Sequence, residues 1–165
     1  MQSNIFVLTS RELLSNPSHW SGHFAPAAEG GASGTQAETS DRILIVEDDL
    51  LIASQMEAAL TDAGFQIAGT ASTGKEALQL AHSQSPTLVV MDIRLAGDRD
   101  GIDTALELFR SHGIRCIFAS AYSDQEAQQR AAPAAPIGWL QKPYAMASLV
   151  AKVRAAVSEL RSRTD

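Results

Sequence analysis

The sequence has a single cysteine and no long apolar run. Because Cys116 stands alone among 165 residues, an internal disulfide is excluded, and its apolar surroundings predict a buried thiol. No apolar run approaches the roughly 20 residues of a membrane span, so we expect no membrane insertion. The short run from Ile5 to Leu8 also lacks the basic flank and cleavage site of a secretion signal. These absences favour a reduced, cytoplasmic location.

Positive charge is also scarce. The chain has 13 Lys and Arg against 19 Asp and Glu, which gives a formal net charge of −6. Direct binding to nucleic acid depends on basic side chains that neutralise phosphates, so this balance argues against it. No helix-turn-helix, nucleotide cyclase or methylesterase pattern accompanies the predicted core. The histidines show no spacing typical of metal ligands, and we assign them no role: His19, His23, His82 and His112.

The length predicts one domain with an appendage. A chain with 45% apolar residues can bury one good core, and it is too short for two ordinary domains. Residues 1–40 include a stretch rich in Gly, Ala, Ser and Pro, which has too little apolar surface to offset its ordering entropy. We therefore predict a flexible N-terminal extension over 1–40 and a domain over 41–165. The slightly apolar segment from Asn4 to Leu14 is either a docking segment or a leader without function.

Strand and helix patterns alternate five times after residue 41. Apolar runs predict strands over 42–46, 65–70, 87–91, 115–119 and 137–141. Apolar positions at helical spacing predict helices near 50–63, 73–84, 101–112 and 144–160, with a weaker one over 124–130 broken by Pro133. In the first helix, these positions are Leu50, Leu51, Met56, Ala59 and Leu60. Strands joined by helical crossovers indicate a doubly wound α/β fold, with a parallel sheet and helices on both faces.

Four of the predicted strands are each followed by a functional side chain. Glu47 and Asp48 follow the first strand and Asp92 follows the third. The fourth ends in the hydroxyl of Ser120, and the fifth leads to the ammonium of Lys142. Open α/β sheets bind ligands at the carboxyl ends of their strands, so we expect these side chains to meet there.

In this order, the pairs Glu47-Asp48, Ser120-Ala121 and Lys142-Pro143, together with Asp92, resemble a response-regulator receiver domain of two-component signalling, of the single-domain, chemotaxis-regulator-like kind. The resemblance covers roughly residues 41–165. It implies a flavodoxin-like, five-stranded sheet with strand order 2-1-3-4-5. It also implies that Asp92 accepts a phosphoryl group from a sensor histidine kinase in a Mg²⁺-dependent reaction, and that a surface conformational switch follows. Such a protein is a phosphoacceptor that catalyses only its own phosphotransfer and dephosphorylation, and is not otherwise an enzyme.

The acidic residues indicate a metal site. Three carboxylates at the ends of neighbouring strands repel one another unless a cation joins them, and hard oxygen ligands suit Mg²⁺. By resemblance, Asp48 and Asp92 bind the metal directly, the main-chain carbonyl of Arg94 completes the protein ligands, and Glu47 acts largely through water. In an alternative interpretation, Glu47, Asp48 and Asp49 only cap the following helix, which would leave Asp92 unexplained.

The remaining residues of the resemblance form a switch. Asp92 would attack phosphorus while Mg²⁺ and Lys142 neutralise charge. Ser120 would donate its hydroxyl to a phosphoryl oxygen and draw the following loop toward the site. Trp139 occupies the position of an aromatic whose rotamer reports that movement, although it could instead simply pack on the last helix. A cis peptide bond is implied between Lys142 and Pro143.

Some features depart from the family pattern. The loop between Asp92 and Asp100 is one residue longer than usual, and Ala96 stands where proline is common. Arg94 and Tyr122 flank the site and could set how fast the phosphoryl group is lost, in a direction that the sequence leaves open.

Two other functions compete with a kinase-driven switch. A Mg²⁺-dependent phosphohydrolase with an aspartyl-phosphate intermediate needs a second carboxylate two residues after Asp92, where Arg94 stands. A phosphate sink or a relay to a histidine phosphotransfer domain would use the same acceptor site, as would a switch that binds a downstream protein target. A binding module without phosphorylation is disfavoured, because every acceptor-site residue is present.

Overall fold

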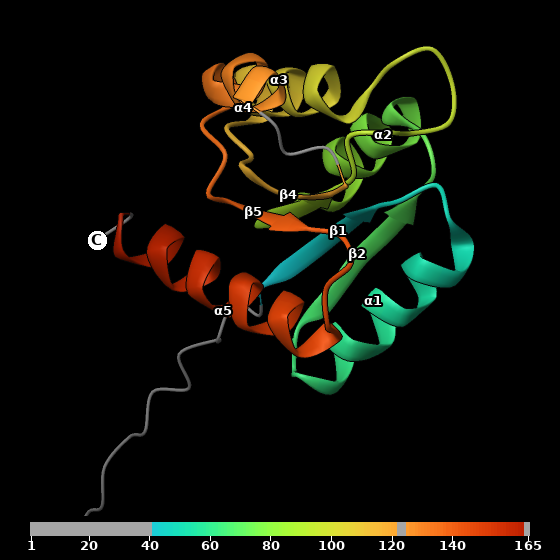
Figure 1. Ribbon diagram of the computed structural model, residues 1–165. Coiled ribbons are helices and arrows are strands. Elements are labelled where there is room, and N and C mark those ends of the chain that lie inside the picture. The colour runs from blue at the N-terminus through green and yellow to red at the C-terminus, as the bar shows by residue number, and fades with distance from the viewer. Residues whose placement is uncertain (1–40, 122–124, 164–165) are drawn as a thin grey trace, which may run out of the picture. The chain divides into compact units, whose positions relative to one another are not determined.

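Strands and helices alternate along the chain as the sequence predicts (Figure 1). The computed structural model describes residues 41–121 and 125–163; the predicted extension over 1–40 and Tyr122 lie outside them. The elements are β1 (Arg42–Val46), α1 (Leu50–Asp62), β2 (Gln66–Ala71), α2 (Gly74–Gln84), β3 (Leu88–Met91), α3 (Gly101–His112), β4 (Cys116–Ser120), α4 (Gln125–Ala131), a 3-10 helix (Ala132–Ala134), β5 (Gly138–Gln141) and α5 (Met146–Ser162).

The strands form one parallel sheet in the order β2-β1-β3-β4-β5. This confirms the doubly wound α/β fold and the strand order that the resemblance implies. β1 and β3 are neighbours, and Val46 pairs with Met91 at their last positions. The residues that follow these two strands therefore leave the sheet side by side.

Helices cover both faces of the sheet: α2, α3 and α4 lie on one face and α1 and α5 on the other (Figure 1). Successive residues of a strand point to opposite faces, so Leu44 and Val46 pack under the first group while Ile43 and Ile45 pack under the second. Cys116 is buried as predicted, and burial raises the pKa of its thiol to about 12, so the thiol stays protonated at neutral pH.

The start of α1 differs from the predicted apolar stripe. Leu50 and Leu51 are 75% and 69% exposed, whereas Ala53, Met56 and Leu60 are buried. The helix predicted from this spacing is present, but the two leucines lie outside its buried face, because the first turn of α1 lies at the edge of the sheet where β1 ends.

Two features near prolines agree with the sequence analysis. α4 ends at Ala131, and Pro133 lies in the 3-10 helix that follows. The peptide bond between Lys142 and Pro143 is cis. Across residues 41–121 and 125–163, no helix combines the length and apolarity that crossing a membrane requires.

Candidate functional site at the carboxyl edge of the sheet

Main-chain hydrogen bonds carry the sheet one residue beyond its strands. At the carboxyl edge, meaning the edge where the parallel strands end, the amide of Asp92 donates to the carbonyl of Val46 at 2.9 Å. The amide of Lys142 donates likewise to the carbonyl of Ser120 at 3.1 Å. The functional residues after these strands are therefore held by the sheet itself, which fixes where their side chains begin.

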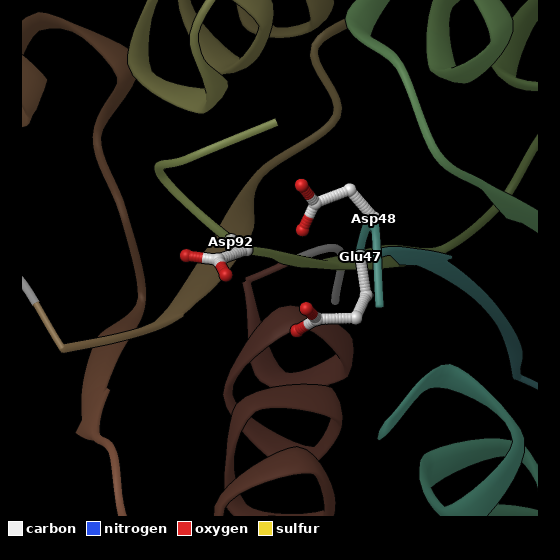
Figure 2. A group of neighbouring side chains, drawn as sticks. All are labelled: Glu47, Asp48 and Asp92. Carbon is white, nitrogen blue, oxygen red and sulfur yellow. The ribbon is translucent and has the colours of Figure 1, made fainter. Parts of the chain in front are cut away.

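Three carboxylates converge at this edge, as the sequence predicts. Glu47 and Asp48 come from the end of β1 and Asp92 from the end of β3 (Figure 2). A carboxylate oxygen from each lies within 4.8 Å of the others. Glu47 and Asp92 are only 2% and 8% exposed, while Asp48 is exposed. The group therefore has two buried members and one that faces solvent.

Lys142 joins the two buried carboxylates. Its Nζ donates to Glu47 Oε2 at 2.6 Å and to Asp92 Oδ2 at 2.7 Å. Burial lowers the pKa of Lys142, but the hydrogen bonds to Asp92 and Glu47 outweigh it and hold the pKa above its ordinary value. The side chain therefore remains a cation at neutral pH, as a charge-neutralising group must.

Glu47 is in the opposite situation. Burial raises its pKa, and the hydrogen bond and charge of Lys142 offset this only in part, while Asp92 raises it further. A buried carboxylate with a raised pKa gains strongly from a nearby cation, since a cation favours its ionised form. The donor set of Glu47, Asp48 and Asp92 consists of hard oxygen atoms, which fits Mg²⁺ better than softer metals.

The structure separates the three consecutive acids by role. Asp49 is the N-cap of α1, where its Oδ1 accepts from the amides of Leu51 at 2.9 Å and Ile52 at 3.1 Å. The capping alternative therefore holds for Asp49, while Glu47 accepts from the Asp49 amide at 3.4 Å and also lies with Asp48 in the carboxylate group. The amide of Arg94 donates to Asp92 Oδ1 at 3.3 Å, and the role of its carbonyl as a metal ligand stays a prediction.

Ser120 and Trp139 occupy strand positions near the site. Ser120 is the last residue of β4 and is 1% exposed. Trp139 in β5 is half-buried and stacks on Phe118, with ring centres 4.6 Å apart and planes inclined by 27°. It packs against the apolar cluster under α2, α3 and α4, which contains no residue of α5. Trp139 thus lies on the α4 side of the sheet, and its role as a reporter stays a prediction.

Gly101 is a site residue that the sequence analysis did not single out. A Cβ atom at this first position of α3 would lie 1.9 Å from the main-chain oxygen of Asp92. The Gly101 amide donates to the carbonyl of Ile93 at 2.8 Å, which closes the loop between β3 and α3. The available signal was a glycine directly after the Asp100 helix cap. Only glycine lets α3 begin this close to Asp92.

An open cleft of about 700 Å³ adjoins the carboxylates between this loop and α4. Arg130 of α4 spans it, with Nη2 lying 2.7 Å from Oδ2 of Asp100. On its other side the loop is held by a bridge between Ala96 and Thr73. The cleft opens onto the following charged residues: Asp48, Arg94, Asp98, Arg99, Asp100, Glu126 and Arg130.

The chain is similar to several known proteins. The family described as "Response regulator receiver domain" matches residues 43–154. The transcriptional regulatory protein PdtaR of Mycobacterium tuberculosis H37Rv is 33% identical over 135 residues, which cover 82% of this chain and 65% of PdtaR. The phyllosphere-induced regulator PhyR of Methylorubrum extorquens is 36% identical over 90 residues, or 54% of this chain and 34% of PhyR. The chain thus spans about two thirds or less of these relatives.

Solved structures show the same fold. The signal receiver domain of a modulated diguanylate cyclase from Desulfovibrio desulfuricans G20 matches with a TM-score of 0.69 and 31% identity, over 75% of this chain and 98% of that one. A CheY-like receiver domain protein from Methanospirillum hungatei matches with a TM-score of 0.70 and 24% identity, over 76% of this chain and 99% of that one.

Proposed function

We propose that Asp92 accepts a phosphoryl group from a sensor histidine kinase, because this chain belongs to the response-regulator receiver family of two-component signalling. The single observation that carries the proposal is the meeting of the Asp92 carboxylate with Lys142, Glu47 and Asp48 at the carboxyl edge of the sheet. The reaction would depend on Mg²⁺, which Asp48, Asp92 and the main-chain carbonyl of Arg94 would hold, with Glu47 acting largely through water.

Transfer forms one O–P bond and breaks one N–P bond. A carboxylate oxygen of Asp92 attacks phosphorus, and the electron pair of the N–P bond returns to the donor imidazole, which leaves as a neutral ring because its other nitrogen already carries a proton. Bound Mg²⁺ supplies neutralisation of charge on the phosphoryl oxygens. Lys142 already contacts Asp92 Oδ2 at 2.7 Å, so its ammonium can follow the charge as it moves to the phosphoryl group. The Ser120 hydroxyl donates to a phosphoryl oxygen and couples the loop after β4 to the site.

The kinase approaches over the first turn of α1. A donor histidine has to come within bonding distance of Asp92, so the segment that carries it must cover the rim of the site. Leu50 and Leu51 lie on that rim, directly after the acidic residues, and are largely exposed. Replacing both with Ser should slow transfer from a phosphorylated histidine kinase and leave labelling by acetyl phosphate unchanged. Equal rates of transfer with and without the leucines would refute this contact.

The other functional alternatives receive less support. A phosphohydrolase needs an acid/base carboxylate two residues beyond Asp92, and Arg94 occupies that position. We therefore propose a phosphoacceptor that acts only on its own phosphoryl group. Its output is a switch that binds a downstream protein target, with a relay to a histidine phosphotransfer domain or a phosphate sink as the alternatives. We place it in the cytoplasm, as a domain over 41–165 with an extension over 1–40.

Labelling by a small phosphodonor tests the proposal. Incubation of the protein with Mg²⁺ and acetyl phosphate should add one phosphoryl group, detected by intact mass. Asp92→Asn should abolish the addition because an amide is a poor nucleophile and a weak ligand for Mg²⁺. Asp49→Asn is the matched control, since asparagine caps a helix as well as aspartate does. Labelling that survives in Asp92→Asn would disprove the proposal.

A further inference from the structure

His82 and His112 meet at the edge of the sheet opposite the carboxylates. His82 lies in the last turn of α2 and His112 is the last residue of α3. Their ring centres are 6.1 Å apart, with the planes inclined by 56°, and both side chains are exposed. Thirty residues separate them in the sequence, which explains why their spacing gave no signal. The fold unites them because α2 leads into β3, α3 leads into β4, and these strands are neighbours.

We propose that His82 and His112 form a binding site for a borderline divalent transition-metal ion such as Zn²⁺ or Ni²⁺. Zn–N bonds to imidazole are about 2.0 to 2.1 Å, so each ring centre lies about 3.2 Å from a shared ion. Two rings on one ion then have centres about 5.2 Å apart at a tetrahedral angle and about 6.4 Å apart at a linear one. The observed separation of 6.1 Å between the ring centres falls within this range. Small rotations of the two exposed side chains can adjust the separation to the coordination angle of the ion.

The surroundings favour a cation at this position. Both helices end at the same edge of the sheet, and the free carbonyls at a helix C-terminus carry partial negative charge. The ends are well defined, because Ser85 and Gly113 close the helices in left-handed conformations with amides that donate to Ala81 and Phe109. The two imidazoles therefore extend from fixed backbone positions on adjacent helices.

The donor atoms determine which metal binds. Imidazole nitrogen suits Zn²⁺, Ni²⁺ and Cu²⁺, whereas Mg²⁺ prefers the oxygen ligands of the carboxylate group. Two protein ligands leave water to complete the coordination, so the site exchanges metal readily. A bound ion would join the C-terminal ends of α2 and α3 and stabilise the folded domain according to its occupancy. This site does not depend on the phosphoacceptor function proposed above.

Histidine ring signals in NMR spectra test the site directly. The experiment uses the full chain carrying His19→Ala and His23→Ala, so that the remaining ring signals belong to His82 and His112. Saturating Mg²⁺ occupies the carboxylates before Zn²⁺ is added. Both ring signals should then shift along one titration curve with a common midpoint, while Mg²⁺ alone leaves them unchanged.

Single replacements separate a shared site from two independent histidines. Two joined ligands bind far more tightly than either alone, so His82→Ala should weaken the response of His112 to Zn²⁺ by at least about tenfold, and His112→Ala should do the same to His82. The rise in thermal midpoint caused by Zn²⁺ should disappear in both variants. An unchanged midpoint at the remaining histidine, or rings that do not respond to Zn²⁺, would show that the pair is an aromatic contact only and would overturn the proposal.

Discussion

Two basic side chains near the start of β1, at the amino edge of the sheet, each meet one acceptor, whereas at the carboxyl edge three carboxylates lie close to one ammonium. Near the start of β1, Arg42 Nη2 lies 2.7 Å from Gln84 Oε1, and Arg161 Nη2 lies 2.5 Å from Asp41 Oδ2. These contacts join α2 and α5 to the start of the sheet, and the second one pairs opposite charges. The part of the amino edge at the start of β1 is thus arranged for stability.

The carboxyl edge has the opposite arrangement. With Glu47, Asp48 and Asp92 ionised, Lys142 leaves two negative charges uncompensated within a few ångströms. Such crowding costs stability in the absence of a cation, and sites that bind ligands commonly carry this cost. The comparison indicates that the imbalance of charge, and not the fold as such, marks the functional edge.

The largest effect should come from one glycine at each edge. Gly101→Ala places a methyl group on the Asp92 carbonyl, and because the obstacle is backbone, the unfolding free energy should fall by about 3 kcal/mol. In Gly113→Ala, at the amino edge, the added methyl group has no atom within 4 Å. The unfolding free energy should therefore fall by only about 1 kcal/mol, because alanine has to adopt a φ of +67°. Urea denaturation of both variants measures the difference. Equal losses would mean that close approach to Asp92 has no special cost.

A neighbouring pair of acids tests the charge imbalance. Asp48→Asn should lower Mg²⁺ affinity at least about tenfold and raise the unfolding free energy without Mg²⁺ by about 1 kcal/mol, because one repelling charge is removed. Asp49→Asn should change neither quantity, since its role is to cap α1. Calorimetric titration and urea denaturation give the two values. If Asp49→Asn reproduced the effect of Asp48→Asn, the division of roles between them would be wrong.

The pH dependence of stability provides a finer test at Glu47. Its folded pKa is raised above the ordinary value of 4.5, so the folded protein takes up the proton first as the pH falls. In metal-free buffer, the protein should therefore gain stability relative to Glu47→Gln between the raised folded pKa and about 4.5. Denaturation of both proteins over this window measures the gain. A relative loss of stability there would show that Lys142 outweighs burial at Glu47.

The smallest effect concerns the link from the carboxyl edge to the sheet surface. Beryllofluoride with Mg²⁺ should move Trp139 from its half-buried position toward a more buried one, and should change its emission in a Trp20→Phe background. Ser120→Ala should remove the change and preserve phosphorylation, because the hydroxyl is the proposed link. The spectrum with Mg²⁺ alone is the reference, since metal can quench tryptophan by itself. An emission change of full size in Ser120→Ala would show that the Ser120 hydroxyl does not couple the phosphoryl site to Trp139.

Much of the fold follows from short-range patterns. The central strands β1 and β3 are continuous apolar runs, and their last residues locate Glu47 and Asp92 without further information. The two exposed leucines of α1 could not be predicted, because a hydrophobic residue at helical spacing does not show where the helix extends past the sheet.

Contacts that depend on three-dimensional approach were also beyond the sequence. The cap formed by Asp49 requires the angle at which the chain enters α1, since Glu47 and Asp48 are equally acidic. The meeting of His82 and His112 depends on where the ends of α2 and α3 lie beside the neighbouring strands β3 and β4, and neither periodicity nor the strand order reports that.

Chemical mapping of the phosphoryl group tests the central claim most directly. An aspartyl phosphate is an acyl phosphate, and borohydride reduces it to an alcohol that permanently marks the modified residue. After treatment with acetyl phosphate, Mg²⁺ and borohydride, peptide mass spectrometry should find the mark at position 92 and nowhere else, and omission of Mg²⁺ should prevent it. A mark at Asp48 or Asp98, or the same yield at Asp92 without Mg²⁺, would contradict the proposed site.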